Sequence, residues 1–440
     1  MEAVSEQKSV YLQAFEAADR LDGWPEERRQ QAIQAFESQG FPTRRMEAWK
    51  HAKLTALTQQ TFKPVPEGGE LSAATVERFA DVAGAVRLVF VDGRFSPRYS
   101  DLDAAVPGLK VQSLAAAFRE DDGLAHEQFG RVMDAESHAF AALNTAFAVD
   151  GAVVDVAPNT VLDAPVVVIF ANSRKASGHA VYPRVLLRAG SNAEVRLVQQ
   201  YLGENEDAAL IAPVSEVLLH DNASVRIQHF QDESLPSWHL GAMRVRVPRD
   251  ARFALHTVTA GARFGRTDVQ VDLEGPGADV SMNGLYLSDG ERYADYHTVV
   301  RHVTDHSHSQ QLFKGVLTGR GESVFDGMIH VARDAQQTDS EQQNNNLLLS
   351  PLALAHSNPR LEIYADDVKC AHGSTVGELD ADALFYLRSR GIARDDAQAL
   401  LTFAFANDVL GSMIEPALAP QARDRLLSVL PGGNLLEAPE

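Results

Sequence analysis

The sequence predicts a mainly β protein whose core is a β-solenoid, and three observations support this fold class. From about residue 149, short runs rich in Val, Leu and Ile follow one another without a long helical pattern. A unit of strand, small polar turn and strand recurs at 187–195, 219–225, 247–253 and 273–280. These turns lie roughly 30 residues apart, a period typical of stacked repeats in which each coil buries its inner face against its neighbours. Because the repeats are imperfect, a β-sandwich or jelly roll stays open as the competing architecture.

Residues 1–148 are predicted to form a helix-rich region with short strands. Pro25 suits the start of a helix and Gly40 its end, so a helix is expected between them. Residues 62–75 are rich in Pro and Gly and are interpreted as a linker. The apolar run 86–91, which ends in an Asp-Gly turn signal, predicts a strand.

A basic and aromatic segment lies between these elements. Trp49 stands close to Arg44, Arg45 and Lys50, which is compatible with an anion or nucleic-acid site. The favoured interpretation is an amphipathic packing segment whose basic edge faces solvent.

The β-solenoid core is placed at residues 149–368. Four histidines gather near its end, and two of them would share a strand face: His297, His302, His306 and His308. Since no carboxylate or cysteine follows them at a recurring ligand spacing, a catalytic metal is not expected there. The run Asn344–Asn346 is interpreted as an amide ladder along the stacked coils.

Cys370, the only cysteine, lies two residues before His372. Residues two apart in a strand share a face, so a thiol and an imidazole would point the same way and could form half of a site for iron, copper or zinc. The alternative is a buried structural thiol beside a hydrogen-bonded histidine. Gly373 is expected to end the strand, which would let the imidazole reach across an interface.

Residues 369–440 are predicted to form a helical segment. One helix begins after Asp380 and carries Leu384 and Leu387 on one face. A second begins near residue 393, with Leu400 and Leu401 on its apolar side. These helices would either cap the solenoid or dock a partner.

Composition narrows the functional classes. The net charge of -20 argues against a nonspecific nucleic-acid binder or a protein of anionic membranes, because both need a basic face. One cysteine cannot form an intrachain disulfide and fits a reducing compartment. The sequence has no secretory signal pattern and no apolar run long enough for a membrane helix, so a cytoplasmic location is expected. It also has no Gly-rich phosphate loop, nucleophile-elbow serine or paired His-Glu zinc motif.

Several motifs, taken together and in order, resemble the Suf-pathway iron–sulfur scaffold proteins, the SufB/SufD family. The segments that carry the resemblance are Gly40–Pro42, Glu47–Trp49, Val324–Ile329, Thr338–Asn344, Leu347–Ser350, Pro359–Ile363, Ala365–Gly373 and Phe385–Gly391. After its cysteine the chain has Ala371–Gly373 where the SufB branch has a glutamate-bearing segment, so the resemblance is to the SufD branch.

The resemblance implies a right-handed parallel β-helix flanked by helical regions. It also implies a complex with SufB, through the β-helix, and with two copies of the ATPase SufC. SufC would dock on the C-terminal helices, at a surface formed by Leu384, Leu387, Arg388, Arg390, Leu400 and Leu401. A homodimer in isolation is a further possibility that the sequence leaves open.

The function expected is therefore that of a non-catalytic scaffold subunit in iron–sulfur cluster assembly. A cluster usually needs about four soft ligands. One cysteine cannot supply them, so a nascent cluster would be shared transiently with the partner and none would be held stably by this chain alone. His372, and less importantly Cys370, are expected to face the partner's ligands. The chain is not expected to hydrolyse ATP.

Two other functions stay open. A β-solenoid carbohydrate-active enzyme would need an acidic cleft, for which Asp268, Asp272 and Asp279 are the candidate carboxylates. A regulatory binding module without cluster chemistry is the other alternative.

Overall fold

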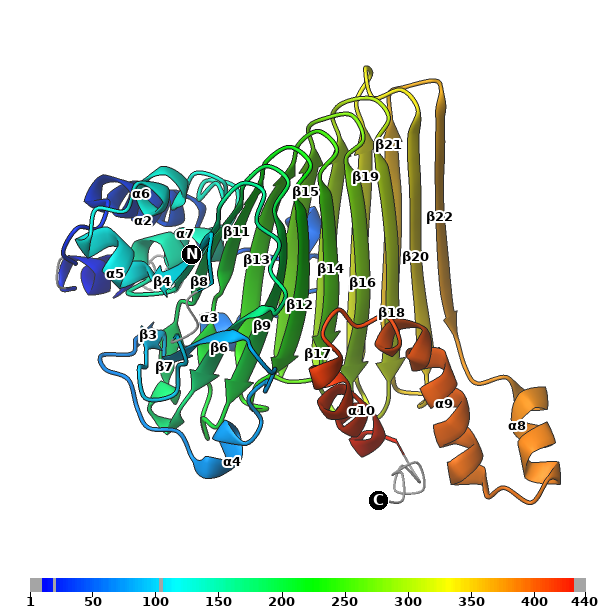
Figure 1. The fold of residues 1–440 in the computed structure, drawn as a ribbon. Coiled ribbons are helices and arrows are strands. Elements are labelled where there is room, and N and C mark those ends of the chain that lie inside the picture. The colour runs from blue at the N-terminus through cyan, green and yellow to red at the C-terminus, as the bar shows by residue number, and fades with distance from the viewer. Residues whose placement is uncertain (1–9, 19–20, 103–105, 431–440) are drawn as a thin grey trace.

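The computed structural model describes residues 10–18, 21–102 and 106–430. Its core is a β-solenoid made of two long sheets that face each other across a shared interior, which we call the lumen (Figure 1). From β5 onward the neighbouring strands of each long sheet run parallel. This pairing confirms the predicted solenoid and excludes a jelly roll, whose strands would be antiparallel.

Each long sheet takes one strand from every coil. Sheet A contains β4 (Leu109–Ser113), β5 (Ala152–Val156), β8 (Arg184–Ala189), β11 (Val214–Leu219), β13 (Trp238–Val247), β15 (Phe264–Leu273), β17 (Tyr293–His302), β19 (Glu322–Val331) and β21 (Leu354–Ile363). Sheet B contains β3 (Arg94–Phe95), β2 (Val86–Val91), β6 (Val166–Asn172), β9 (Glu194–Gly203), β12 (Ser224–Asp232), β14 (Arg252–Thr259), β16 (Asp279–Ser288), β18 (His308–Leu317), β20 (Thr338–Leu348) and β22 (Val368–Gly377). Three short strands join at one margin: β1 (Lys63–Pro64), β7 (His179–Val181) and β10 (Leu210–Ile211).

The coils stay in register because equivalent residues pair from one coil to the next. Val271 pairs with Val300, which pairs with Ile329, each 29 residues further along. At one corner of the early coils the chain turns through residues with a left-handed backbone, a conformation that Asn tolerates better than most residues.

That corner carries an amide ladder. The Asn192 side chain donates to Asn159 Oδ1 at 2.8 Å, and the Asn222 side chain donates to Asn192 Oδ1 at 2.9 Å. The ladder predicted at Asn344–Asn346 is wrong, because its register neighbours are Phe313–Gly315, which carry no amide side chain.

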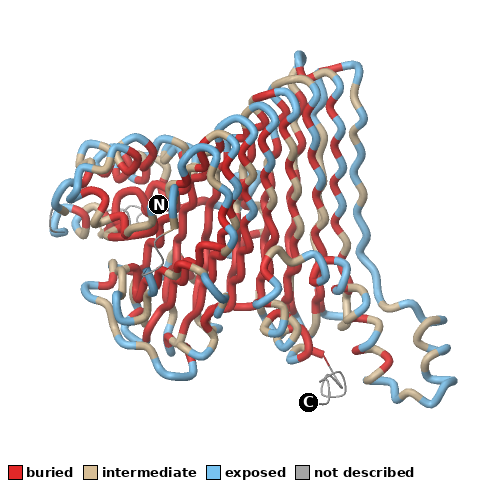
Figure 2. Tube along the Cα trace, viewed as in Figure 1, coloured by how far each residue is buried: buried red, intermediate tan, exposed pale blue. Residues whose placement is uncertain are grey.

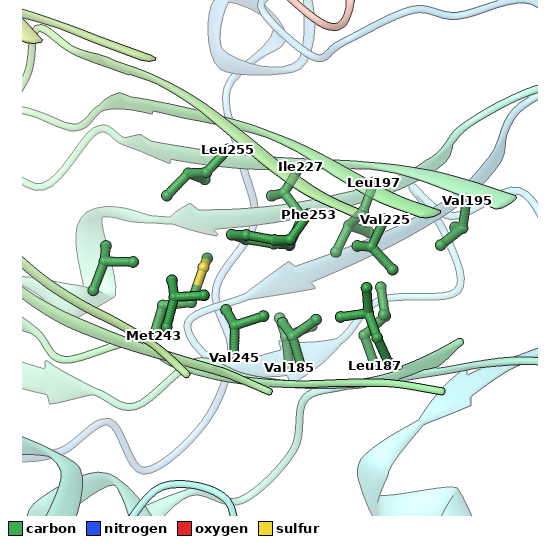
Figure 3. Close-up of a cluster of buried hydrophobic side chains, with 14 of the residues drawn as sticks. Val185, Leu187, Val195, Leu197, Val225, Ile227, Met243, Val245, Phe253 and Leu255 are labelled. Carbon is green, nitrogen blue, oxygen red and sulfur yellow. The ribbon is translucent and has the colours of Figure 1, made fainter. Parts of the chain in front are cut away.

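The early lumen is mainly aliphatic, although it also holds the buried side chains of Gln199, Ser215 and His229. In parallel strands alternate side chains point inward, and valine and leucine dominate those positions (Figure 3). Leu197 and Leu187 are fully buried, and Phe253 is 1% exposed. Burying each such side chain stabilises the fold by about 1.5–3 kcal/mol, so these coils form the apolar core.

The lumen becomes polar in the later coils. Tyr286 Oη donates to Asn346 Oδ1 at 2.7 Å and accepts from Asn344 Nδ2 at 2.9 Å. Ser357 Oγ donates to Asn344 Oδ1 at 2.6 Å. These groups satisfy one another, which offsets the cost of burying them.

The N-terminal helices cover the outer face of sheet A (Figures 1 and 2). They are α2 (Glu26–Gln39), η1 (Glu47–Trp49), α3 (Thr55–Thr58), α5 (Leu114–Arg119), α6 (Gly123–Gln128) and α7 (Ala139–Phe147). The short helix α4 (Ala73–Val76) packs instead with the outer face of sheet B, and η2 (Arg174–Ala176) lies between β6 and β7. A fully buried ion pair joins this cover to the solenoid: Arg184 binds Glu216 and the Asn144 side chain, and Glu216 accepts from the backbone N–H of Gly130. Removing one partner of such a pair costs about 3–5 kcal/mol.

The segment predicted as a linker, residues 62–75, is instead part of the fold. Lys63 and Pro64 pair with β7, and the Glu204 carboxylate accepts hydrogen bonds from the Ser72 backbone and the Thr75 hydroxyl. Its Pro and Gly residues shape a path along the sheet margin rather than a free connection.

The C-terminal helices are α8 (Ala381–Ser389), α9 (Arg394–Leu410), η3 (Pro416–Leu418) and α10 (Ala419–Ser428). Helices α9 and α10 pack on the outer face of sheet B. Polar contacts fix α9: Lys314 Nζ donates to Asp408 Oδ2 at 2.5 Å, and His256 Nε2 lies 2.8 Å from Val409 O. By contrast α8 buries no residue and projects beyond the last coil (Figures 1 and 2).

Candidate functional site

The last coil of the solenoid is unfinished. β21 pairs only with β19 and β22 only with β20, so within the described residues each has a free edge. The two strands face each other across the mouth of the lumen. Unpaired backbone N–H and C=O groups along a strand edge are a template for another chain, which makes this end of the molecule a candidate interface.

Cys370 and His372 lie on β22 with the same orientation, as their spacing predicts. Their register partners on β20 are Ser340 and Gln342, both of which point into the lumen. The side chains of Cys370 and His372 therefore line the mouth of the lumen. The strand continues past Gly373 to Gly377, so the prediction that it ends beside the histidine is wrong.

Cys370 is half-buried against the apolar floor of the last coils, where Ile329 and Ala365 pack beside it. Burial raises the pKa of the Cys370 thiol above its ordinary value, and the nearby Asp339 carboxylate raises it further. The protonated thiol is thus favoured, and a proton must leave before the sulfur can bind a metal.

A chain of buried hydrogen bonds leads away from this cysteine. Its register neighbour Ser340 shares a 2.7 Å hydrogen bond with Ser309, and Ser309 shares one of 2.9 Å with His302 Nε2. Nδ1 of the same histidine lies 2.8 Å from Ser307 Oγ. Burial lowers the pKa of His302 to about 4, so this imidazole is neutral at pH 7.

His372 is exposed at the mouth, directly above a buried amide. Gln342 is fully buried, and neither its Nε2 nor its Oε1 has a hydrogen-bond partner. An unpartnered buried polar group costs about 1–3 kcal/mol, and the other inward polar side chains of β20 are hydrogen-bonded. In the coil below, Nε2 of Gln311 is also unpartnered. Sequence reasoning missed Gln342, because only the coil register shows that it points inward beneath His372.

The ligands at this end are too few to enclose a metal. Across the described residues, no group of three or more His, Cys, Asp or Glu side chains is arranged to hold a metal ion. One thiol and one imidazole amount to half of the roughly four ligands that an iron–sulfur cluster needs. What the arrangement can do is contribute ligands to a site that another chain completes.

The four clustered histidines do not come together. His297 points outward and contacts Asp295 at 3.0 Å, whereas His302 is buried in the lumen. His306 occupies a left-handed turn position, and His308 pairs with Asp279 at 3.1 Å.

The basic segment around Trp49 packs against the outer face of sheet A, which confirms the packing interpretation. The Arg266 guanidinium lies 3.6 Å from the Trp49 ring centroid and donates to Ala48 O at 2.6 Å. Burial alone would raise the pKa of the Asp268 carboxyl, but Arg266 and His138 hold it well below its ordinary value.

The candidate acids of a carbohydrate-active enzyme are already engaged. Asp268 binds Arg266, Asp272 binds Arg244, and Asp279 lies on the other sheet beside His308. Paired and divided between two sheets, these carboxylates do not form an acidic cleft.

The predicted docking residues lie on the two helices that leave the last coil. Leu384, Leu387 and Leu401 are half-buried and Leu400 is 37% exposed. The face that α9 buries is formed by Ala399, Thr402, Ala406 and Val409, which differs from the face predicted from the leucines. The predicted docking set leaves out two aromatic residues of α8, Phe385 (72% exposed) and Tyr386 (56% exposed). Arg390 lies over the Tyr386 ring at 4.7 Å. Large apolar groups left this exposed commonly mark an interaction surface.

Two family models match the chain. One describes the core domain of SufBD proteins of the SUF system for FeS cluster assembly and matches residues 170–405. The other describes the N-terminal region of SufBD proteins and matches residues 18–168. No described helix is both long and apolar enough to cross a membrane.

Individual relatives agree with these models over nearly the whole chain. An iron–sulfur cluster assembly SufBD family protein of Synechocystis is 32% identical over 90% of this chain and 89% of its own length. The iron–sulfur cluster assembly protein SufD of Escherichia coli is 30% identical, over 92% of this chain and 93% of its own. SufD of Bacillus subtilis is 24% identical over the same shares.

Proposed function

The chain belongs to the SufBD family of Fe–S cluster assembly proteins, and from that premise we propose that it is a non-catalytic scaffold subunit of the SufD type. In this role it shares a nascent-cluster site with a SufB-type partner and docks a SufC-type ATPase. The single cysteine fits a reducing, cytoplasmic setting.

The observation that carries this proposal is the unfinished last coil, with Cys370 and His372 on the lumen side of a free strand edge. A strand of the partner that pairs with β21 or β22 would continue the solenoid across the interface. The partner's ligands would then lie beside the thiol and the imidazole. The same free edges would support a homodimer when no partner is present.

Within the shared site we assign the larger role to His372. Its imidazole is exposed and supplies a nitrogen ligand or a proton acceptor. The thiol of Cys370 is half-buried and its raised pKa disfavours the thiolate. The cluster is the cargo of this site, passed on after assembly, and not a resident cofactor of the chain.

The docking part of the proposal rests on α8 and the adjoining face of α9. Because α8 has no fully buried residue, it gains little packing from the fold that carries it, and a partner would add to its order. Leu384, Leu387, Leu400 and Leu401, with Arg388 and Arg390 beside them, form an apolar surface with a basic edge suited to a protein partner.

The experiment that tests the cluster site compares two variants in a strain that depends on this pathway. We expect His372→Ala to assemble with its partners but to lower the iron and sulfide content of the purified complex by at least about tenfold. Cys370→Ser should lower it only mildly. Ser374→Ala is the matched control, because Ser374 lies two residues further along the same strand face. A His372→Ala complex that carries wild-type amounts of iron and sulfide would contradict the assignment.

A further inference from the structure

The inward side chains of β20 differ in one respect. Those of Thr338, Ser340, Asn344 and Asn346 are buried and hydrogen-bonded within the structure. Gln342 is buried as deeply, yet both ends of its amide are unpartnered. The exception lies directly beneath His372, its register partner on the last strand.

The position of this amide is fixed from the opposite wall. A Cβ added at Gly327 of β19 would lie 2.3 Å from Gln342 Nε2 and 2.7 Å from its Oε1. The amide thus rests against Gly327, where any residue with a side chain would collide with it. Below it, Gln311 is tied to the opposite wall by a 2.8 Å hydrogen bond between its Oε1 and Thr298 Oγ1. Gly327 thus leaves the space that the Gln342 amide occupies, and Nε2 of Gln311 below it is itself unpartnered.

We propose that Gln342 is a positioning residue that orients the imidazole of His372 by a hydrogen bond from its amide. The inference rests on the proposed role of His372. On β22, the next strand along the solenoid, His372 alone is in register with Gln342, and both side chains are on the lumen face. A side-chain amide offers an NH2 group that donates and an oxygen that accepts, so it complements either ring nitrogen of a neutral imidazole.

Such a bond sets which ring nitrogen is free to face a partner. A histidine that binds a metal commonly has its other ring nitrogen held by a neighbouring polar group, which fixes the tautomer and the ring orientation. An exposed imidazole at a strand edge otherwise samples several rotamers. A partner that covers the mouth of the lumen would remove competing water and so favour formation of the hydrogen bond between amide and imidazole.

The test reads the tautomer of His372 directly. The full chain is labelled with 15N-histidine and measured alone and assembled with a SufB-type partner; the His372 signals are assigned by their loss in His372→Ala. We expect one neutral tautomer to predominate in at least one of these states. In Gln342→Met the ratio of the major to the minor neutral tautomer of His372 should fall about fivefold. This factor corresponds to the net free energy of one hydrogen bond.

Two further variants complete the design. Gly327→Ala keeps the glutamine but displaces its amide, so it should shift the tautomer in the same direction even if Gln342→Met folds poorly. Gln343→Met makes the same chemical change at the next, outward-facing residue and should leave His372 unchanged. Unaltered His372 signals in Gln342→Met and Gly327→Ala, both alone and assembled, would overturn the proposal.

The iron and sulfide content of the same complexes separates this proposal from the one on which it rests. If His372→Ala keeps its full cluster content while Gln342→Met shifts the tautomer, the positioning is correct and the ligand role is wrong. If His372→Ala loses the cluster while Gln342→Met leaves the tautomer of His372 unchanged, the ligand role is correct and the positioning is wrong.

Discussion

The early and late coils of the solenoid share one backbone plan but differ in how they are finished. The early lumen is filled mainly by aliphatic side chains, and its outer wall is covered by helices tied down through the buried Arg184–Glu216 pair. The last coil has a lumen that combines polar side chains with an apolar patch around Ile329, two free strand edges and a mouth lined by a thiol and an imidazole. The same repeat thus provides a stable apolar core at one end and an incomplete set of ligands at the other.

This difference shows how a repeat fold separates its tasks. Each coil contacts mainly its neighbours, so polar groups in the last coils do not weaken the apolar packing several coils away. A globular core would couple the two more tightly. The following predictions test that separation, from the largest expected effect to the smallest.

Matched leucine truncations should differ strongly between the two ends. Leu197→Ala removes a fully buried side chain from the aliphatic lumen and should lower the free energy of unfolding by about 2–5 kcal/mol. Leu361→Ala, in the half-buried last coil, should lower it by no more than about 1 kcal/mol. Thermal unfolding of both variants measures the difference. Equal losses would show that the ends are not separate in stability.

Acid should loosen the late coils through His302. Burial lowers the pKa of His302 from 6.5 to about 4 in the folded chain, so the unfolded chain binds a proton more readily between these values. The stability contributed by the neutral imidazole is intact above pH 6.5 and is lost as the pH falls toward 4; at pH 5 the loss is about 2 kcal/mol. Burial also lowers the pKa of His229 on β12, to about 3, so a second acid response is expected in that earlier coil.

Hydrogen exchange of β17 to β20, compared at pH 7 and pH 5 after correction for the intrinsic rates, measures this effect. His302→Asn should remove most of the pH dependence. His306→Asn, at an exposed turn, is the matched control and should leave it in place. If hydrogen exchange in His302→Asn depends on pH as strongly as in the unaltered chain, groups other than His302 cause the acid response.

The smallest effect on stability is expected at α8, where the effect on binding should be large. Replacing Arg388 and Arg390 with Glu should change the free energy of unfolding by less than about 0.5 kcal/mol, because α8 buries no residue. Binding of a SufC-type ATPase should weaken by at least about tenfold in a titration, or about 1.4 kcal/mol. Arg320→Glu, at an exposed turn before β19, is the control. Undiminished binding would show that the ATPase docks on another surface of the chain.

The solenoid itself could be predicted because its signals are local. Small polar turns such as those at Asn192 and Asn222 recur at a nearly fixed spacing, and both residues adopt the left-handed backbone that the turns require. The shared face of Cys370 and His372 follows from strand alternation alone. These features depend on residues close together in sequence.

Features that depend on distant residues were missed. The packing of the Trp49 segment was predicted, but its partner Arg266, more than two hundred positions away, was not. The inward position of the unpartnered Gln342 amide depends on Gly327 in the opposite wall and on the coil register. The strand continues beyond Gly373 because pairing with β20 outweighs the turn tendency of a single glycine. Propensity describes one segment, whereas these outcomes depend on which segment lies beside it.

The order of the coils also has a consequence for how the protein is made. In both sheets each strand from β5 onward pairs with the strand of the preceding coil, so every coil is formed on one that has already emerged from the ribosome. The aliphatic coils come first, and the strand with Cys370 and His372 is the last to be added. A chain interrupted during translation would therefore lack the strand that presents these ligands. The partner could complete its site only on a finished solenoid.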